Sequence, residues 1–348
     1  MLISQVFLLG CEHLESERDA PVLFPASSAS NFQQLVSVHW LKALLDFKDL
    51  KDPRYRPVSY ENDHFVILEA SWASLEKAAQ YHAGHVPGAI HINTDDFENG
   101  SPRWRLRSDE ELQGVVGKAG ITPQSTVIVY GEQLIAAARV WWILKYAGVA
   151  DVRLLDGGFK AWKAAGYPVE TRPQVADPVT FSAPVMASVI ANTEYVRRQL
   201  GSNQVVLADV RSEGEYRGLK SGYSYLEAKG RIPGAIHLGN ADDQNLRYSQ
   251  RNGRLRSPSE VRALWAESGL STLEEGLLDQ ELIFYCGGGW RSSLAFFYAS
   301  LLGVEKIRNY SDGWSAWSTV YQRDATARGR SPGWRQDPSS NPIASGRP

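Results

Sequence analysis

The chain contains a repeated motif, and this repeat constrains its fold more than any other feature. Residues 83–91 read AGHVPGAIH, and residues 229–237 read KGRIPGAIH. Two further correspondences follow the motif in the same order, pairing residues 126–131 with 282–286 and residues 158–162 with 313–317. Matches that recur in one order at a similar offset indicate two copies of one fold in tandem.

Within each copy, strand-like and helix-like segments alternate. Residues 65–68 and 205–208 are short apolar runs typical of buried strands, while residues 136–146 and 261–267 have helical character. This alternation predicts an α/β fold in which a parallel sheet carries helices on both faces. At 348 residues, the chain is long enough for two such domains, each with its own core.

The repeat and the composition also give the expected domain boundaries. We expect an N-terminal extension, a first copy, a polar linker with prolines, a second copy and a Gly/Pro/Ser-rich tail, over residues 1–32, 33–170, 171–188, 189–325 and 326–348 respectively. We expect the tail to be loose or to pack across a domain as an irregular strap.

A glycine-rich turn in the second copy carries the most reactive residue of the sequence. Residues 285–293 read YCGGGWRSS, between an apolar strand (282–285) and an apolar helix that begins near Ser292. The three glycines allow successive backbone N–H groups to turn inward, and Arg291 adds a positive charge. Such surroundings favour the thiolate of Cys286 and predict a nucleophile. A cysteine that serves only as a small buried hydrophobe would need neither the glycines nor the cation.

The same turn predicts a binding site for a small anion. Arginine suits this role because it stays charged and offers a fixed fork of donors, although each candidate arginine could instead form a surface ion pair. Asp209 and Arg211, at a strand end, are expected to form a structural pair that holds the neighbouring loop. The predicted substrate-binding residues are Gly287, Gly288, Gly289, Trp290 and Arg291 in the turn and, across the pocket mouth, Arg217 and Arg231.

Composition and charge argue against several other kinds of site. The formal net charge is −2, which gives no reason to expect nucleic acid as a partner. Only two cysteines occur, Cys11 and Cys286, so neither a disulfide framework nor a zinc site made of cysteines is expected, and no metal is predicted. The sequence has neither a P-loop nor a dinucleotide fingerprint, and no cofactor is predicted.

The N-terminus has a short apolar run, residues 2–9, followed by Gly10 and Cys11 in a lipobox-like Leu-Leu-Gly-Cys sequence. The run is too short to span a bilayer, and the first basic residue after it is Arg18. We therefore expect a cytoplasmic protein without a membrane span. Export or a lipid anchor through this apolar segment is the alternative.

Several of these motifs together resemble the tandem rhodanese-domain sulfurtransferases. They are the two PGAIH turns, the strand end Asp209-Val210-Arg211, the loop 286–291 and the closing Asp312-Gly313-Trp314, and the match extends over roughly residues 33–320. The loop is closest to the CGTGWR form of bacterial periplasmic thiosulfate sulfurtransferases. The resemblance implies two rhodanese-like domains and a transfer in two steps. A small anionic donor gives its outer sulfur to Cys286 as a persulfide, and an acceptor then removes it; thiols, cyanide, thioredoxin or a sulfur-carrier protein all fit that role.

The loop sequence gives mixed indications of the donor. Relatives that use 3-mercaptopyruvate carry a hydroxyl residue where this chain has Gly288, which argues against that donor. Thiosulfate enzymes carry a basic residue where this chain has Gly287, but Arg291 resembles theirs. We favour thiosulfate, with 3-mercaptopyruvate as the alternative. The first copy has Gly131-Glu132 where the second has the nucleophile, so it is predicted to be non-catalytic and to cover one side of the pocket.

The sequence argues against two other classes of function. Phosphatases with a related fold need an arginine six residues after the cysteine, and that position here is Ser292, so the loop is one residue too short. A non-catalytic anion-binding or protein-binding module would commonly have lost the cysteine, as the first copy has. Both readings are less favoured than sulfur transfer.

Overall fold

The protein is described here from a computed structural model, which covers residues 31–101, 103–239, 247–250, 252–270, 279–324 and 333–347. The apolar N-terminal run and Cys11 lie outside these residues. Among the helices that the structure describes, none has the length and apolar character needed to cross a membrane.

The first copy is built on a five-stranded sheet with the order β1-β5-β4-β2-β3. All neighbouring strands run parallel. The strands are β1 (Leu35–Val36), β2 (Phe65–Ser71), β3 (Ile90–Asn93), β4 (Thr126–Gly131) and β5 (Asp151–Leu155).

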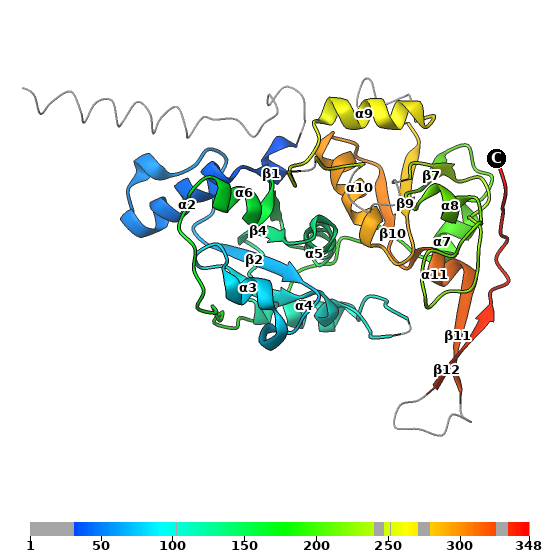
Figure 1. The fold of residues 1–348 in the computed structure, drawn as a ribbon, viewed down its shortest axis with the longest axis horizontal. Helices are drawn as coiled ribbons and strands as arrows, with labels where there is room; N and C mark the ends of the chain where they lie inside the picture. The colour runs from blue at the N-terminus through cyan, green and yellow to red at the C-terminus, as the bar shows by residue number, and fades with distance from the viewer. Residues whose placement is uncertain are drawn as a thin grey trace, which may run out of the picture.

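The second copy repeats this topology, which confirms the predicted tandem α/β architecture. Its sheet has the order β6-β10-β9-β7-β8, and every pairing is again parallel. Figure 1 shows the two copies next to each other, with each sheet flanked by helices. The strands are β6 (Ile190–Ala191), β7 (Val205–Asp209), β8 (Ile236–His237), β9 (Glu281–Tyr285) and β10 (Ile307–Tyr310).

Helices fill the connections between strands, as the alternation predicted. The first copy contains α2 (Val38–Leu50), α3 (Ala79–Ala83), α4 (Asp109–Lys118), α5 (Leu134–Tyr146) and α6 (Gly158–Ala164). The second contains α7 (Thr193–Arg198), α8 (Glu213–Tyr216), α9 (Pro258–Glu267), α10 (Trp290–Leu301) and α11 (Gly313–Ser318). Short 3-10 helices are η2 (Phe32–Gln34), η3 (Pro53–Tyr55), η4 (Leu75–Lys77), η5 (Thr94–Phe97) and η6 (Ala187–Val189).

Local sequence explains how several of these helices begin. Helices α4, α8 and α9 each start with a capping box, in which a serine accepts from the N–H three residues later and a glutamate accepts from the serine N–H. The first pair is Ser108 with Glu111. Helix α10 instead follows Gly289, whose backbone is left-handed (φ 86°), so its N-terminus lies directly at the glycine turn.

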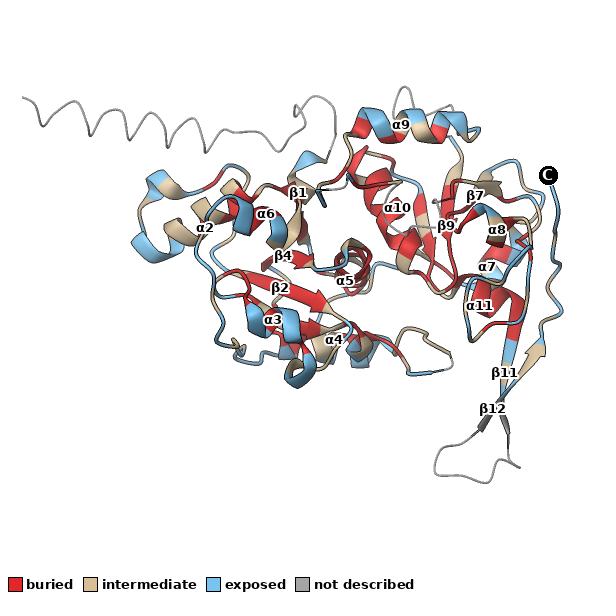
Figure 2. Cartoon of the chain, in the orientation of Figure 1, coloured by how far each residue is buried: buried red, intermediate tan, exposed pale blue. Residues whose placement is uncertain are grey.

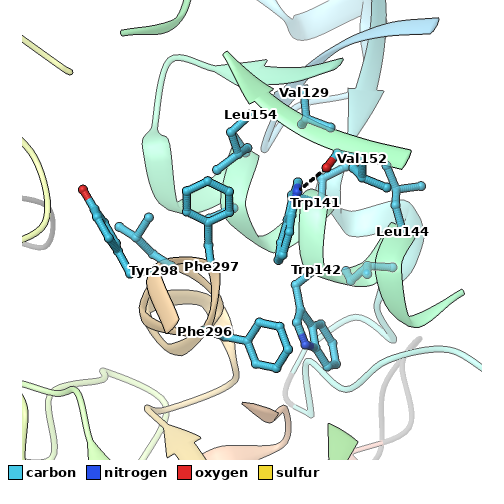
Figure 3. Packing of buried hydrophobic residues seen from close by; sticks show 14 of the residues in the cluster. Val129, Trp141, Trp142, Leu144, Val152, Leu154, Phe296, Phe297 and Tyr298 are labelled. Atoms are coloured by element: carbon cyan, nitrogen blue, oxygen red, sulfur yellow. Dashed lines mark hydrogen bonds between the residues drawn. The ribbon is translucent and has the colours of Figure 1, made fainter. Parts of the chain in front are cut away.

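The two copies share one large hydrophobic core between them. Helices α5 and α10 are buried along almost their whole length, as the red ribbons of Figure 2 show. They pack on each other through Trp141, whose ring lies 5.0 Å from that of Phe297 and 6.3 Å from that of Phe296 (Figure 3). Aromatic burial of this extent makes the two copies one packed unit.

The linker and the tail both pack onto the domains. The linker lies along the first copy, where the Val179 N–H donates to Gly117 O (2.9 Å). The tail is more regular than expected, because β12 (Gly333–Pro338) pairs antiparallel with β11 (Thr319–Asp324) to form a hairpin. Further on, Ala344 forms a two-way backbone bridge with Arg231. The expected irregular strap is thus partly a strand, since the edge of β11 takes up its backbone groups.

Candidate active site

Cys286 follows the last residue of β9 and lies in the turn that leads into α10. This position is at the carboxyl end of a central parallel strand, where open α/β sheets bind ligands. The backbone after the cysteine is held by α11, because the Trp314 N–H donates to Cys286 O (2.7 Å) and the Ser315 N–H to Gly287 O (2.9 Å). The start of α11 therefore fixes the floor of the turn.

The surroundings of the thiol stabilise its thiolate. Cys286 is 1% exposed, and burial alone would raise its pKa. The charge of Arg291 and hydrogen bonds from Ser292 and from the Gly288 N–H act in the opposite direction and outweigh burial, so the pKa of Cys286 lies below its usual value. The Ser292 hydroxyl lies 3.6 Å from the sulfur. Cys286 is thus a buried thiol whose surroundings favour its thiolate form.

Arg291 is held by the carboxylate of Glu215, which was not predicted as a site residue from the sequence. Its two terminal nitrogens donate to the two oxygens of Glu215, each at 2.9 Å, in a bidentate ion pair. Glu215 also accepts from Ser212, through the capping box of α8. Gly222 leaves room for this carboxylate, because a Cβ there would lie 2.1 Å from Oε1 of Glu215. The arginine beside the thiol is therefore fixed in place from α8.

Tyr223 covers the turn and occupies donors that a substrate anion could use. Its hydroxyl oxygen accepts from the Gly287 N–H (3.0 Å) and from Arg291. Burial, the largest influence, raises the pKa of this phenol, which keeps it neutral. Because Tyr223 offers an oxygen to an N–H and to a guanidinium, it stands where an anionic oxygen would bind.

The three glycines of the turn differ in what they allow. A Cβ on Gly287 would lie 2.0 Å from the ring of Tyr223, and a Cβ on Gly289 would lie 2.5 Å from both Nη1 of Arg139 and Ser311 O. A Cβ on Gly288 would meet no atom within 4 Å. Gly287 and Gly289 are thus required by close neighbours, while Gly288 faces open space.

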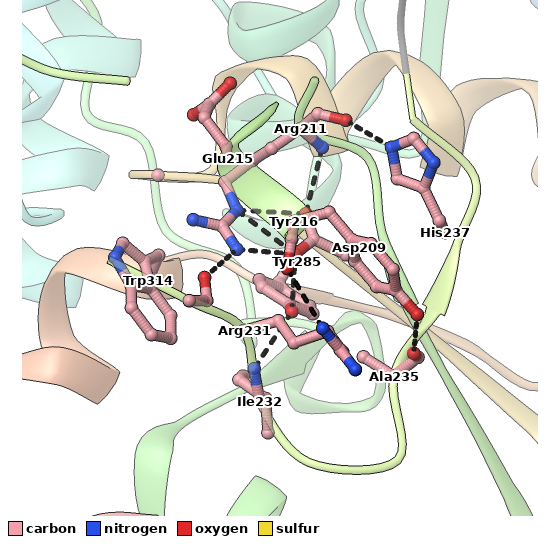
Figure 4. A network of polar contacts seen from close by, with 12 residues as sticks. Asp209, Arg211, Glu215, Tyr216, Arg231, Ile232, Ala235, His237, Tyr285 and Trp314 are labelled. Atoms are coloured by element: carbon pink, nitrogen blue, oxygen red, sulfur yellow. Dashed lines mark hydrogen bonds and ion pairs between the residues drawn. The ribbon is translucent and has the colours of Figure 1, made fainter. Parts of the chain in front are cut away.

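A buried network supports the turn from the neighbouring strand (Figure 4). Arg211 donates through Nε and Nη2 to Asp209, at 3.0 and 2.6 Å, and both side chains are fully buried. Tyr285, directly before the cysteine, donates its hydroxyl to Asp209 (2.6 Å), and its oxygen accepts from the Ile232 N–H (3.2 Å). This arrangement fits the expected structural pair, which joins β7, β9 and the PGAIH turn.

The other two predicted arginines lie elsewhere. Arg217 pairs with Glu213 one turn earlier (3.1 Å). Arg231 lies over the ring of Tyr216, 4.5 Å from its centroid, and donates to Gly346 O in the tail (2.9 Å). Among the contacts of the described residues, neither side chain reaches the glycine turn. Their role in donor binding stays a prediction, without support from these contacts.

The first copy supplies residues to the site that sequence reasoning did not identify. Arg139 of α5 forms a buried ion pair with Glu98 (2.8 Å) and donates to Gly289 O (3.4 Å) and to the hydroxyl of Ser311 (3.0 Å). Trp72, which follows β2, stacks on Trp290 with the ring centroids 5.1 Å apart. The first copy therefore both supports the turn from below and forms part of its aromatic rim.

These contacts span long sequence separations, and only one had a local signal. The spacing of Ser212 and Glu215 is that of a capping box directly after the Asp209 strand end, which could have pointed to Glu215. Nothing local marks Tyr223, Arg139 or Trp72.

Comparison with known proteins agrees with this architecture. The Rhodanese-like domain family matches residues 37–165 and 192–319. Thiosulfate sulfurtransferase YnjE of Escherichia coli (strain K12) is 36% identical over 295 residues, covering 83% of this chain and 64% of YnjE. Mouse thiosulfate sulfurtransferase is 28% identical, covering 82% of this chain and 92% of the mouse protein. The chain therefore spans less than two thirds of YnjE but nearly all of the mouse enzyme.

Solved structures give the same picture. The crystal structure of YnjE has a TM-score of 0.76 and 32% identity, over 91% of this chain and 69% of that one. A structure of EanB with a cysteine persulfide and ergothioneine has a TM-score of 0.76 and 30% identity, over 94% of this chain and 74% of that one. The chain belongs to the rhodanese family. Within that family, its two rhodanese-like domains in tandem are the architecture of the tandem-domain sulfurtransferases.

Proposed function

We propose that this protein is a sulfurtransferase that moves a sulfane sulfur from thiosulfate, through a persulfide on Cys286, to a thiophilic acceptor. The observation that carries the proposal is a buried thiol whose pKa is lowered by Arg291 and by hydrogen bonds from the loop, at the end of a rhodanese strand. A thiolate is the form that attacks a sulfane sulfur. The thiosulfate sulfurtransferases among the relatives support the reaction class.

The chemistry proceeds in two displacements. The Cys286 thiolate attacks the outer sulfur of thiosulfate, the S–S bond to the enzyme forms, and the bond to the sulfonate sulfur breaks with its electron pair leaving on sulfite. The persulfide is itself an anion, so the same N–H groups and Arg291 stabilise it. A nucleophilic acceptor then attacks the outer sulfur, and Cys286 leaves as the thiolate.

Donor entry requires a change around Tyr223. Its hydroxyl occupies the Gly287 N–H and one arm of Arg291, which are the donors best placed for an incoming anion. We infer that the donor anion displaces this hydroxyl and takes over both hydrogen bonds. Because the exchange replaces a neutral acceptor with a charged one, the new bonds are the stronger pair.

Thiosulfate is favoured over 3-mercaptopyruvate on the composition of the turn. No hydroxyl stands at position 288, and the space there is open. The mouse 3-mercaptopyruvate sulfurtransferase is 24% identical, below the 28% of the mouse thiosulfate enzyme. One relative is named sulfur carrier protein TtuD and is 30% identical. Thiols, cyanide, thioredoxin and a sulfur-carrier protein all fit the role of acceptor.

Intact mass after brief incubation with each donor tests the proposal. We expect thiosulfate to add one sulfur, about 32 Da, to the wild type and to Cys11→Ala, but not to Cys286→Ala. Cys11→Ala is the matched control, because it removes the other cysteine of the chain. Subsequent cyanide should remove the added mass. Absence of the added mass with both thiosulfate and 3-mercaptopyruvate would refute the proposal, and faster loading by 3-mercaptopyruvate would overturn the choice of donor.

A further inference from the structure

The first copy retains a cavity at the place that corresponds to the catalytic turn. Gly131 ends β4 as Cys286 follows β9, and it lines a cavity of about 360 Å³ at the carboxyl ends of the strands. This edge of a parallel sheet is where such folds bind ligands. The cavity is separate from the Cys286 turn, none of whose residues line it.

The most unusual group in the cavity wall is Glu69, on β2. Glu69 is only 4% exposed, and its Oε2 atom has no hydrogen-bond partner among the residues that the structure describes. The corresponding residue of the second copy, Asp209, has an arginine two positions later as its ion-pair partner. Two positions after Glu69 stands Ser71, whose hydroxyl bonds to His91 instead (2.8 Å). A buried carboxylate without a partner is costly, and a bound cationic group would relieve that cost.

The other residues that line the cavity indicate what else a ligand would need. Lys160 and Lys163 are exposed and line the same cavity, at the side of α6. Apolar and aromatic groups also line the cavity, including the stacked rings of Tyr130 and Phe159, whose centroids are 6.4 Å apart. The lining of the cavity therefore combines a buried carboxyl group, two exposed lysines beside the exposed Glu132, and apolar groups.

We propose that this cavity binds a small zwitterion of the α-amino acid type, with its ammonium group on Glu69 and its carboxylate near Lys160 and Lys163. A metal ion fits poorly, because the described residues contain no group of three or more histidine, cysteine or acidic side chains that could hold one. An anion alone would meet the unpaired carboxylate of Glu69. Burial and then the charge of Glu132 raise the pKa of Glu69 to about 7, which an adjacent ammonium group would lower.

Thermal shift with each of the twenty standard amino acids, followed by calorimetry on the hits, tests this site on the full wild-type chain. We expect at least one amino acid to bind, and its deaminated and decarboxylated analogues to bind at least about tenfold more weakly. Glu69→Gln should cause a similar loss, and the double variant Lys160→Ala/Lys163→Ala a smaller one. Glu110→Gln, an exposed glutamate on α4, is the matched control and should leave binding unchanged.

Two readouts separate this site from the catalytic one. Glu69→Gln should retain sulfur transfer at the wild-type rate, which also shows that the variant is folded. Binding should persist in Cys286→Ala. The proposal is overturned if no amino acid binds, if Glu69→Gln binds as well as the wild type, or if binding is lost in Cys286→Ala. None of these results depends on which sulfur donor the enzyme uses.

Discussion

The two copies share one strand order, yet they treat the carboxylate at the end of the second strand in opposite ways. In the second copy, Asp209 is buried with Arg211 and accepts a hydrogen bond from the Tyr285 hydroxyl. In the first copy, Glu69 is buried without such a partner. In the second copy, the carboxylate is paired and supports the turn that contains Cys286. In the first copy, the corresponding carboxyl group lines a cavity and has an oxygen without a hydrogen-bond partner among the described residues.

The turn at the end of β4 also differs from the turn at the end of β9. A Cβ on Gly131 would lie 2.5 Å from Ala70 O, so the first copy has no room for any side chain where the second has Cys286. Its α5 nonetheless carries Arg139, which contacts the catalytic turn. The comparison teaches that one domain of a tandem pair can lack a cysteine at its own turn and still hold the other copy's turn in place.

Removing the support in the catalytic copy should have the largest effect. Asp209→Asn removes the ion-pair partner of the fully buried Arg211, and we expect a loss of about 3–5 kcal/mol in the free energy of unfolding. Chemical denaturation at neutral pH measures it. Ser71→Ala, at the position matching Arg211 in the first copy, is the control and should cost far less. A loss below about 1 kcal/mol for Asp209→Asn would mean that the pair contributes little.

Weakening the charge beside the thiol should affect catalysis next. Arg291→Lys cannot make the bidentate pair with Glu215, so we expect kcat/KM for thiosulfate to fall about 100-fold. Because Arg291 lowers the pKa of Cys286, the variant's pKa should rise, and alkylation by iodoacetamide should reach half-maximal rate at a higher pH. Arg217→Lys is the matched control. An unchanged alkylation profile in Arg291→Lys would contradict the assigned electrostatics.

The sequence was sufficient for the fold and for placing Cys286 in a turn between a strand and a helix. The PGAIH repeat and the alternation of segments predicted two parallel α/β sheets, and three glycines before Arg291 marked the turn. Hydrophobic periodicity indicates the strands and helices directly. The turn is marked by adjacent glycines, so both patterns can be seen in short stretches of sequence.

The partners of the turn could not be read in the same way. Glu215 lies 76 residues from Arg291 and Tyr223 lies 68 from it, so their contacts arise only when β7 and β9 pair. Arg231 was a reasonable candidate by charge, but its guanidinium packs on Tyr216 and the tail. Charge in a sequence shows what a residue can bind, while the tertiary fold determines what it meets.

Neutralising the unsatisfied carboxylate of the first copy should stabilise the protein. The pKa of Glu69 is raised to about 7 from 4.5, so the folded state resists ionisation that the unfolded chain undergoes. Wild-type stability should therefore decrease as pH rises from about 4.5 to 7. Glu69→Gln removes this dependence, and we expect it to gain about 1–3 kcal/mol at pH 8 and almost nothing at pH 4. Denaturation at both pH values measures the gain. Equal effects at the two values would show that ionisation of Glu69 is not the cause.

The smallest expected change in stability is at Gly288, and it separates the two turns most directly. A Cβ there meets no atom within 4 Å, so Gly288→Ser should alter the free energy of unfolding by less than about 0.5 kcal/mol. Gly131→Ser, in the turn of the first copy, should destabilise clearly, because its Cβ would meet Ala70 O. The added hydroxyl at position 288 can also donate to a carboxylate or carry a proton, which a pyruvate leaving group needs and sulfite does not. We therefore expect the ratio of kcat/KM for 3-mercaptopyruvate to that for thiosulfate to rise severalfold in Gly288→Ser, with Gly288→Ala as the control that adds the Cβ without the hydroxyl. An equal rise in both variants would assign donor choice to the shape of the turn rather than to the hydroxyl.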